Sequence, residues 1–512
     1  MVESATEYET VIGLEVHVQL QTQSKMFCSC RADYQSAEAN TRVCPVCLGL
    51  PGTLPVINRK AVEYTIMTGL ALNCRIPGFS KFDRKNYPYP DLMKGYQISQ
   101  YDLPLAVGGF LELDAPEGAA ETERRRIGIT RVHLEEDVAK LQHHRSDGRN
   151  SNANRAYSLV DVNRSGVPLM EVVSEPDMRS PEEAREYLLT LHSILQYLGV
   201  STVNMQDGSF RCDANISIRP KGSEQLGTRS EVKNMNSFRS VFQALQFEVD
   251  RQRRVVESGG RVVQETRGWV EERSVTVSQR SKEHAHDYRY FPEPDLPPLN
   301  IDGAWVEEIR GRLPELAPQR RERFARQYAV PDYDARLLTS SKEMADFFEN
   351  TVAKKQHSGA TSDATLEGFA KSASNWILGD LSRLMNLDNG DVSSLKVTPE
   401  HMFELIGLVE NGSISVTMAK TVLEEAFSSG DSPVKIVEEK GYTQISDSSA
   451  VKLAVAEAID ANPKAVADYL GGKDTATRFL VGQVMKITKG QAKPDLANQL
   501  VVEMLEELKG KA

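Results

Sequence analysis

The sequence predicts an α+β protein, with a domain of strands and helices up to about residue 295 and an almost wholly helical remainder. Three observations favour this class. Segments such as GLEVHVQL, residues 13–20, alternate apolar and polar residues, which is typical of a β-strand with one buried face. Two amphipathic helices interrupt these strands, and beyond residue 299 the apolar spacing is helical.

The two helices of the first part are predicted by their end signals as well as by their spacing. In residues 180–199, Ser180 is the expected N-cap, Glu183 completes a capping box and Gly199 ends the helix. The second helix is expected from about residue 237 to residue 258, with an apolar stripe on one face and with Gly259 and Gly260 as its end. Both helices therefore have one face for packing against a sheet.

Two further segments predict domain boundaries. The Pro-rich stretch FPEPDLPPL, residues 291–299, cannot continue a helix or a central strand, because proline lacks the backbone donor. The turn-rich SSGDSP, residues 428–433, separates a last helical segment. A chain of 512 residues is too long for one hydrophobic core. We therefore expect three domains, at residues 1–295, 296–432 and 433–512.

Charge and composition exclude several classes of protein. The net charge of −11 argues against non-specific coating of nucleic acid, because phosphate contacts need Lys and Arg. The acidic start MVESATEYET is unlike a secretory or transit peptide, and no apolar run approaches the roughly 18 residues of a membrane span. We expect a cytoplasmic protein with no membrane partner. Residues 473–493 nevertheless hold five basic residues against one acid, a contact surface for nucleic acid or a solvated helical face.

Four cysteines have metal-ligand spacing. Cys28 and Cys30 form a CxC pair, and after thirteen intervening residues Cys44 and Cys47 form a CxxC pair. Two close pairs of thiolates can converge on one zinc ion, whereas disulfides are disfavoured in the cytoplasm. Because four thiolates would close the coordination shell, we expect a structural Zn²⁺ rather than a catalytic one.

Acidic residues recur on the polar faces of several predicted strands. The candidates are Glu15 and His17 in GLEVHVQL, Asp213 in SFRCDANISI, Glu231 in RSEVKN and Glu136 in ITRVHLEED. In any one strand, such acidic residues are explained as the polar face of a half-solvated sheet. If the strands share one sheet, the carboxylates crowd together and repel one another unless they are protonated or neutralised by a cation. Their hard oxygens suit Mg²⁺ and make phosphoryl transfer a candidate chemistry. The chain has neither a GxxxxGK[ST] loop nor a protein-kinase signature, so a nucleotide would bind in another way.

Long segments of the chain resemble one family. ETVIGLEVHVQL, FDRKNYPYPDLMKGYQISQYD, IGITRVHLEED, LVDVNRSGVPLMEVVSEPD, GSFRCDANISIRP and DYRYFPEPDLPPL are similar to the B subunits of the bacterial tRNA-dependent aspartyl/glutamyl amidotransferases. The resemblance is dense over the first 295 residues, and ISVTMAKTVLEE extends it into the helical part. It implies a cradle-shaped catalytic (kinase) domain with a mixed, largely antiparallel sheet, then a helical domain and a small helical tail that binds tRNA.

The resemblance also implies an activity. Such a subunit uses ATP and Mg²⁺ to phosphorylate the side-chain carboxylate of Glu-tRNA(Gln) or Asp-tRNA(Asn). Ammonia from glutamine, released by a partner A subunit, then displaces the phosphate to leave an amide. The present chain lacks the Gly/Ser-rich amidase signature, so it would depend on A and C subunits in a heterotrimer. The rival hypothesis is a non-enzymatic, zinc-containing tRNA-binding scaffold subunit.

Carried over to this sequence, the family's Mg²⁺ positions correspond to Glu15, His17, Glu136, Asp213 and Glu231. The resemblance gives catalytic roles to His17 and Glu136, and to two lysines. Lys85 in DRKNY and Lys94 in LMKGY are similar to positions along the ammonia path or active pocket, unless they are solvated surface lysines. The four cysteines match a zinc site that only some members of the family have.

Overall fold

The computed structural model describes residues 7–113, 125–144, 157–281, 288–357, 363–388, 390–442, 448–471, 473, 475–488 and 492–509. The chain forms two compact units, Met1–Leu316 and Ala317–Ala512. Because each unit has its own packing, the two are described separately below.

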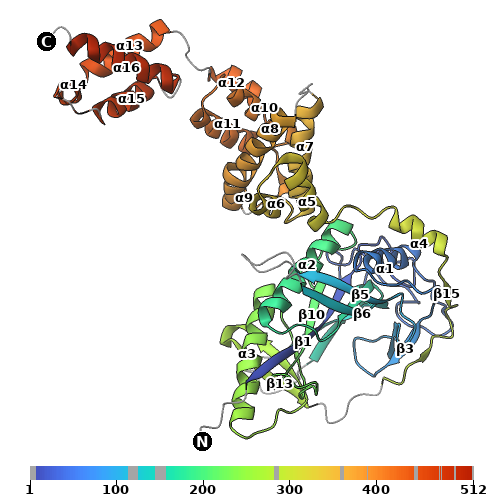
Figure 1. Ribbon diagram of the computed structural model, residues 1–512. Helices are drawn as coiled ribbons and strands as arrows, with labels where there is room; N and C mark the ends of the chain where they lie inside the picture. The colour runs from blue at the N-terminus through green and yellow to red at the C-terminus, as the bar shows by residue number, and fades with distance from the viewer. Residues whose placement is uncertain are drawn as a thin grey trace, which may run out of the picture. The chain divides into compact units, whose positions relative to one another are not determined.

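An eight-stranded sheet forms the centre of the first unit (Figure 1). Its strand order is β13-β12-β11-β10-β1-β9-β6-β5, and every neighbouring pair is antiparallel except β11 and β12. The sheet is therefore mixed and largely antiparallel, which confirms the predicted class. The strands are β1 (Tyr8–Gln19), β5 (Ala106–Leu113), β6 (Arg125–Glu136), β9 (Pro168–Ser174), β10 (Phe210–Pro220), β11 (Ser230–Lys233), β12 (Glu265–Val270) and β13 (Val275–Ser281).

Three helices cover one face of this sheet: α1 (Arg59–Ala71), α2 (Pro181–Leu198) and α3 (Phe238–Glu257) (Figure 1). Leu14, Val16 and Val18 of β1 are buried in the core with the apolar stripes of α2 and α3. Since successive side chains of a strand point to opposite faces, the polar residues of the same strand face away from the helices. The strand pattern thus assigns one face to the core and leaves the other face for chemistry.

The ends of α2 are as expected, with one difference. The Ser180 side chain accepts a hydrogen bond from the Glu183 backbone N–H, and Gly199 has a left-handed φ of 64°. The Glu183 carboxylate, however, accepts from the Arg179 N–H rather than from that of Ser180, at 2.6 Å. The capping interaction is therefore shifted by one residue.

The first unit extends beyond the expected boundary at residue 295. Strand β14 (Phe291–Pro292) pairs with β3 (Asp83–Asn86), which also pairs with β4 (Tyr96–Ser99). Strand β15 (Leu299–Asn300) pairs with β2 (Phe79–Ser80), and α4 (Gly303–Arg310) packs against α1. Prolines are tolerated on edge strands, so the Pro-rich segment is an arm of this unit rather than a linker. The two strands β7 (Lys140–His144) and β8 (Tyr157–Asp161) form a separate antiparallel pair.

The second unit is helical, as predicted. Its helices are α5 (Ala317–Tyr328), α6 (Asp332–Leu338), α7 (Lys342–His357), α8 (Asp363–Trp376), α9 (Ser382–Asp388), α10 (Pro399–Glu410), α11 (Val416–Ser429), α12 (Pro433–Lys440), α13 (Ser448–Asp460), α14 (Pro463–Leu470), α15 (Thr475–Ile487) and α16 (Pro494–Lys509). Helices α13–α16 share a hydrophobic core of their own, whereas α12 packs on α10 and α11. The tail core therefore begins after residue 442, ten residues beyond the expected boundary.

An ion-pair cluster joins α5 to α7 and gives a prediction about pH. Buried Arg320 donates to Glu349 at 2.7 Å, and Arg323 contacts the same carboxylate. Burial opposes ionisation of Glu349, but the hydrogen bonds from Arg323 and Arg320 outweigh it and lower its pKa. A carboxyl whose pKa is lower in the folded state stabilises the fold above its unfolded pKa of about 4, and this stabilisation is lost as pH falls below that value.

We expect Glu349→Gln to lower the free energy of unfolding by about 1–3 kcal/mol at pH 7. The difference from the parent protein should shrink as pH falls from about 5 to 3, where the parent carboxyl becomes protonated. Urea unfolding at a series of pH values measures both effects. Glu367→Gln, which removes an exposed carboxylate from α8, is the control and should change neither. An equal loss of stability at every pH would contradict the assignment.

Candidate active site

A cleft of about 1020 Å³ lies on the polar face of the eight-stranded sheet. Its floor consists of side chains from β1, β6, β9, β10 and β11, and its walls include residues that follow β3 and β4. The large helices occupy the opposite face, so this cleft remains open to a ligand. A concave site with converging polar groups is the usual form of an active site.

Strand register brings four of the five predicted acidic-face residues together. Glu15 on β1 lies opposite Asp213 on β10. Glu231 on β11 lies opposite Asn215, whose amide donates to Glu15 at 3.0 Å. His17 lies between Arg211 on β10 and Glu171 on β9. Glu15, His17, Asp213 and Glu231 all line the cleft.

Glu136 and Lys94 lie elsewhere, which corrects the expected cation set. They form an ion pair with each other, and the Glu136 carboxylate also accepts from the Ile98 N–H at 3.0 Å. Both line a second cavity of about 210 Å³ that also touches Cys28 and Cys47. The physical reason is the strand alternation: residues 135 and 136 are neighbours on β6, so only one of them can face the cleft. That residue is Glu135.

Three residues of the cleft floor could hold a metal ion. One ligand atom from each of His17, Glu135 and Glu171 lies within 4.8 Å of the others. His17 Nε2 is 3.5 Å from Glu171 Oε2 and 3.7 Å from Glu135 Oε1. Glu135 Oε2 is buried without a hydrogen-bond partner in the described part of the chain, as is Nδ1 of neighbouring His133. Orphaned buried oxygens of this kind fit an ion that supplies the missing contact.

The electrostatics of the floor depend on mutual pairing. Burial disfavours the Glu171 carboxylate, but facing His133 and His17 outweigh this and hold its pKa well below the ordinary value. Burial likewise lowers the pKa of His17, but the carboxylates of Glu171 and Glu135 more than reverse this and raise it. Burial raises the pKa of Glu15, and nearby Glu171 adds to the effect. The floor therefore holds more negative charge than its own histidines neutralise.

Basic side chains alternate with these acids. Lys233 contacts Asp213 and lies 3.3 Å from Glu231 Oε1, and Lys85 Nζ lies 4.0 Å from Glu135 Oε2. Burial lowers the pKa of each lysine, but the facing carboxylates raise it further, so both remain charged at neutral pH. Arg211 is fixed by buried Asp137 at 3.0 Å. The cleft thus has cations near its carboxylates that can contact phosphate oxygens.

Several cleft residues were missed by the sequence analysis, notably Glu135, Glu171 and His133. The signal for Glu135 was its spacing from His133 in ITRVHLEED, because residues two apart on a strand point to the same face. Glu171 interrupts the apolar run PLMEVVS, and a carboxylate in such a run needs a buried partner. That partner is an imidazole on each neighbouring strand.

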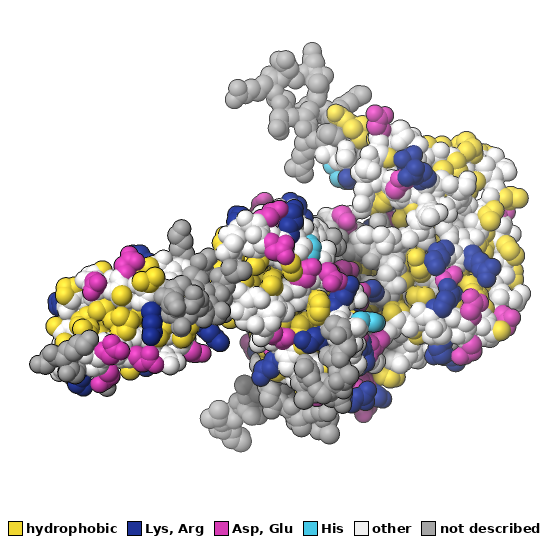
Figure 2. Space-filling model, turned by 90° about the horizontal axis from the view of Figure 1, so that it is seen from above, with side chains coloured by type: hydrophobic (Ala, Val, Ile, Leu, Met, Phe, Trp, Pro, Cys, Tyr) yellow, Lys and Arg dark blue, Asp and Glu magenta, His cyan; other side chains and the backbone are white. Residues whose placement is uncertain are grey.

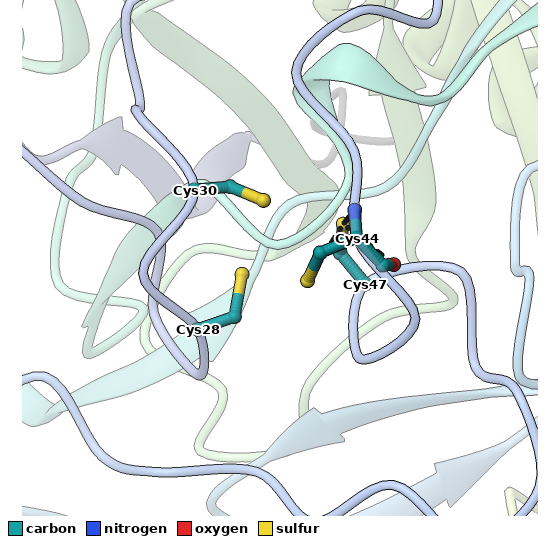
Figure 3. A group of neighbouring side chains, drawn as sticks. All are labelled: Cys28, Cys30, Cys44 and Cys47. Carbon is teal, nitrogen blue, oxygen red and sulfur yellow. Dashed lines mark hydrogen bonds between the residues drawn. The ribbon is translucent and has the colours of Figure 1, made fainter.

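The four predicted zinc ligands converge (Figure 3). Their sulfur atoms lie within 4.8 Å of one another, and Cys44 Sγ is 3.9 Å from Cys47 Sγ. Zinc–sulfur bonds of about 2.3 Å in a tetrahedron place sulfurs somewhat under 4 Å apart. A hydrogen bond from Cys28 lowers the pKa of Cys47, so the cluster favours a thiolate. The donor set therefore fits a closed structural zinc site.

We expect the parent chain to bind one zinc ion at this cluster and a Cys44→Ser variant to lose it. The thermal midpoint of unfolding should fall by about 5–10 °C, because binding energy of a structural zinc is also folding energy. Metal analysis of the purified protein and calorimetry measure the two effects. Cys74→Ser, which changes a buried cysteine outside the cluster, is the control and should keep the zinc. Unchanged zinc content in Cys44→Ser would contradict this assignment.

Comparison with known proteins places this cleft in a family. Residues 10–307 match the model of the GatB/GatE catalytic domain, and residues 346–505 match that of the GatB domain. The chain belongs to the GatB family. It is 57% identical over 98% of its length to the B subunit of the aspartyl/glutamyl-tRNA(Asn/Gln) amidotransferase of Dehalococcoides mccartyi, and the match covers that whole protein. The B subunits of the same name from Moorella thermoacetica and Caldicellulosiruptor saccharolyticus are 54% and 52% identical, again over 98% of this chain and the whole relative.

The GatB/GatE match contains the whole described cleft and the cysteine cluster, and the GatB-domain match continues into α16. The expected recognition, the enzyme class of an amidotransferase subunit and the order of a sheet domain before a helical part are therefore confirmed. Within the described residues, no helix has the length and apolar character needed to span a membrane.

The basic stretch of the GatB domain is only partly described. Lys473 is exposed but pairs with Asp468 at 3.0 Å, and Arg478, Lys486 and Lys493 are exposed. Lys489 and Asp474 lie outside the described residues. On the face seen in Figure 2, the part that holds α13–α16 carries acidic and hydrophobic side chains beside the basic ones. The tail therefore has a mixed surface, and the described basic residues of this stretch lie on α15 and its flanks.

Proposed function

We propose that this chain is the subunit of a tRNA-dependent amidotransferase that activates the side-chain carboxylate of a misacylated tRNA. Its substrates are Glu-tRNA(Gln), Asp-tRNA(Asn) or both, and the relatives' names carry both specificities. The observation that carries the proposal is the cleft floor, where carboxylates from five different strands surround two imidazoles and several fixed cations. We place the reaction in the cytoplasm, where tRNA is charged.

The chemical problem explains why such a floor is needed. A carboxylate is a poor acyl donor, whereas its mixed anhydride with phosphate has a good leaving group. A substrate carboxylate oxygen bonds to the γ-phosphorus of ATP, and the bond to the β-phosphate oxygen breaks to release ADP. Ammonia then bonds to the carbonyl carbon, the bond to the phosphate breaks, and phosphate leaves with the electron pair while nitrogen loses a proton.

The residues that would hold Mg²⁺ are His17, Glu135 and Glu171 on one side and Glu15, Asp213 and Glu231 on the other. When bound, Mg²⁺ neutralises charge on a transferring phosphoryl group and aligns it with the attacking oxygen. Lys85, Lys233 and Arg211 of this chain would contact phosphate oxygens as the ligand charge enters the cleft. Asp137 orients Arg211 through a buried ion pair, and so acts as a positioning residue.

Ammonia would come from a partner A subunit within a heterotrimer that also contains a C subunit. The position of the Lys94–Glu136 ion pair supports an entry for ammonia on the side of β6 that faces away from the cleft floor. A small cavity lined by both residues is also lined by Asp137 and Val138, which border the main cleft. We therefore assign this pair to the ammonia path and not to the cation site.

Hydroxylamine capture tests the proposed chemistry. With the reconstituted heterotrimer, ATP, Mg²⁺ and misacylated tRNA but no glutamine, an acyl phosphate should react with added hydroxylamine to give a tRNA-linked hydroxamate and one ADP. Omission of ATP should remove both products. Formation of the tRNA-linked hydroxamate without ATP consumption would overturn the proposal, and so would ATP-dependent amidation that hydroxylamine never intercepts.

The alternative is a non-enzymatic, zinc-containing scaffold subunit that only binds tRNA. It is favoured by the well-formed cysteine cluster but leaves the convergence of acids in the cleft unexplained. If the scaffold hypothesis were right, removal of a cleft carboxylate would leave amidation unchanged. That comparison is made with Asp213, below.

A further inference from the structure

A group of tyrosines stands beside the acidic floor and is not used by the proposed chemistry. We call Tyr87, Tyr89, Tyr101, Tyr288 and Tyr290 the tyrosine rim, and all five line the main cleft. They come from three separate segments of the chain. Tyr87 and Tyr89 follow β3, Tyr101 follows β4, and the other two lie in the segment that leads into β14. Convergence of one residue type from three segments on one wall is a feature of the fold rather than of any single motif.

Four of the five rings, those other than Tyr89, contact one another in an ordered way. Tyr101 and Tyr290 are stacked, with centroids 4.3 Å apart and planes 10° apart. Tyr288 packs edge-on against both Tyr87 and Tyr290, at 5.6 and 6.0 Å. Tyr101 is 56% exposed although Tyr290 covers one of its faces, so much of its remaining ring surface is open to solvent. The pair is therefore a stack of two rings that can take a third.

The rim is built like a surface that receives a ligand and not like core packing. Tyr89 and Tyr101 are both more than half exposed. None of the five phenol hydroxyls donates or accepts a hydrogen bond within the part of the chain that the structure describes. Burial raises the pKa of Tyr290 to about 12, so its phenol is neutral and does not repel an electron-rich ring.

Lys85 connects the rim to the floor. Its Nζ lies 5.1 Å from the centroid of the Tyr288 ring and 4.0 Å from Glu135 Oε2. A ligand with a flat aromatic end and an anionic end could therefore place the first on the rim and the second at the lysine. A nucleotide has this form, with its base separated from its phosphates by a ribose.

The arm that carries Tyr288 and Tyr290 is held firmly in place. Arg84 on β3 donates to both oxygens of buried Glu293, at 2.8 and 2.7 Å, and its guanidinium lies 4.3 Å from the Tyr96 ring centroid. The Asn86 side chain also donates to the Arg289 carbonyl at 2.9 Å. These bonds fix the arm on both sides of Tyr290, so the two-ring stack is preformed and costs little ordering on binding.

We propose that the tyrosine rim binds an adenine base by extending the Tyr101–Tyr290 stack with a third ring. This rests on the proposed function, whose two substrates both present adenosine: ATP, and the 3′-terminal nucleotide of tRNA. Base stacking on an aromatic side chain strengthens binding by about tenfold or more per base. Loss of the open ring should therefore weaken binding by about tenfold, with little change in the chemical step.

The test uses the reconstituted heterotrimer with Tyr101→Leu and Tyr101→Phe, since Tyr101 is exposed and its loss leaves the core intact. Tyr101→Leu should raise the KM for one adenosine-bearing substrate about tenfold at nearly constant kcat, while Tyr101→Phe, which keeps the ring, should resemble the parent. Separate titrations of ATP and of misacylated tRNA identify the source: a shift for ATP alone assigns its base to the rim, and a shift for tRNA alone assigns the terminal adenosine.

A binding measurement keeps the inference separate from the proposed chemistry. Equilibrium dialysis with ATP and with the trinucleotide CCA needs no turnover, and one of these probes should bind Tyr101→Leu about tenfold more weakly than Tyr101→Phe. If hydroxylamine capture failed but the two variants still differed in binding, the proposed phosphorylation would be rejected and the rim would remain a binding site for a base. The inference would be overturned if both variants bound both probes as the parent does. It would also be overturned if Tyr101→Phe and Tyr101→Leu weakened binding equally.

Discussion

Replacement of Asp213 by alanine should abolish ATP-dependent amidation by the heterotrimer, with a fall in kcat on the order of 10³-fold or more. Asp213 lies opposite Glu15 in the sheet and contacts Lys233, so its loss removes a proposed cation ligand and leaves the lysine with one carboxylate fewer. Binding of misacylated tRNA should be largely unchanged, because the tRNA contacts are expected on the tail. Rate measurements with saturating ATP and filter binding of tRNA separate the two effects.

A control variant is available on the same pair of strands. Glu9 on β1 pairs with Arg219 on β10 at 2.6 Å and does not line the cleft. Glu9→Gln therefore removes a carboxylate from the same two strands and should keep nearly full activity. If Asp213→Ala retained normal activation of the carboxylate, the scaffold hypothesis would be favoured over the enzymatic one.

Removal of the tail should raise the KM for tRNA by about tenfold or more. The structure shows where to cut: α12 packs with α10 and α11, whereas α13–α16 have their own core, so the deletion should take residues 443–512 and keep α12. Phosphate contacts dominate the affinity for nucleic acid, and the exposed basic residues of α15 would be lost. Glutamine hydrolysis by the partner A subunit should change little, which a glutaminase assay without tRNA can check.

A charge reversal in the full-length chain tests the same surface without truncation. Arg478→Glu with Lys486→Glu changes two exposed residues of α15 and should weaken tRNA binding, with a smaller dependence on salt than the parent shows. Lys371→Glu on α8 is the matched control, because it reverses an exposed charge outside the tail. Equal tRNA affinity for the parent, the deletion and the double variant would exclude this role of the tail.

Local patterns were reliable where the chain's own periodicity decides the structure. The alternation in GLEVHVQL gives β1 with Leu14, Val16 and Val18 buried, and the cap signals give α2 its observed ends. Cysteine spacing was sufficient for the cluster, because two short-range pairs need only one loop to bring them together. The Pro-rich segment was misassigned as a boundary because proline marks edge strands as well as linkers, and only pairing partners distinguish the two.

The alternation of side chains along β6 decides which of its carboxylates faces the cleft. The sequence has three acids in a row, Glu135, Glu136 and Asp137, and does not show which of them faces the cleft. A shift of one residue along the strand moves a side chain from the cleft to the opposite face of the sheet. The resemblance to relatives carried Glu136 into the cation set, whereas the structure turns Glu135 toward His17 and pairs Glu136 with Lys94.

The strand and helix types, the cluster of four cysteines and the family could all be read from the sequence, because they depend on periodicity, short spacing and long shared segments. Tertiary structure alone decided that β1 lies between β9 and β10, so that Glu171 joins His17 and Asp213 faces Glu15. It also decided that tyrosines from three segments form one wall of the cleft. The physical reason is that strand order and register come from packing between distant segments, which no local pattern of residues records.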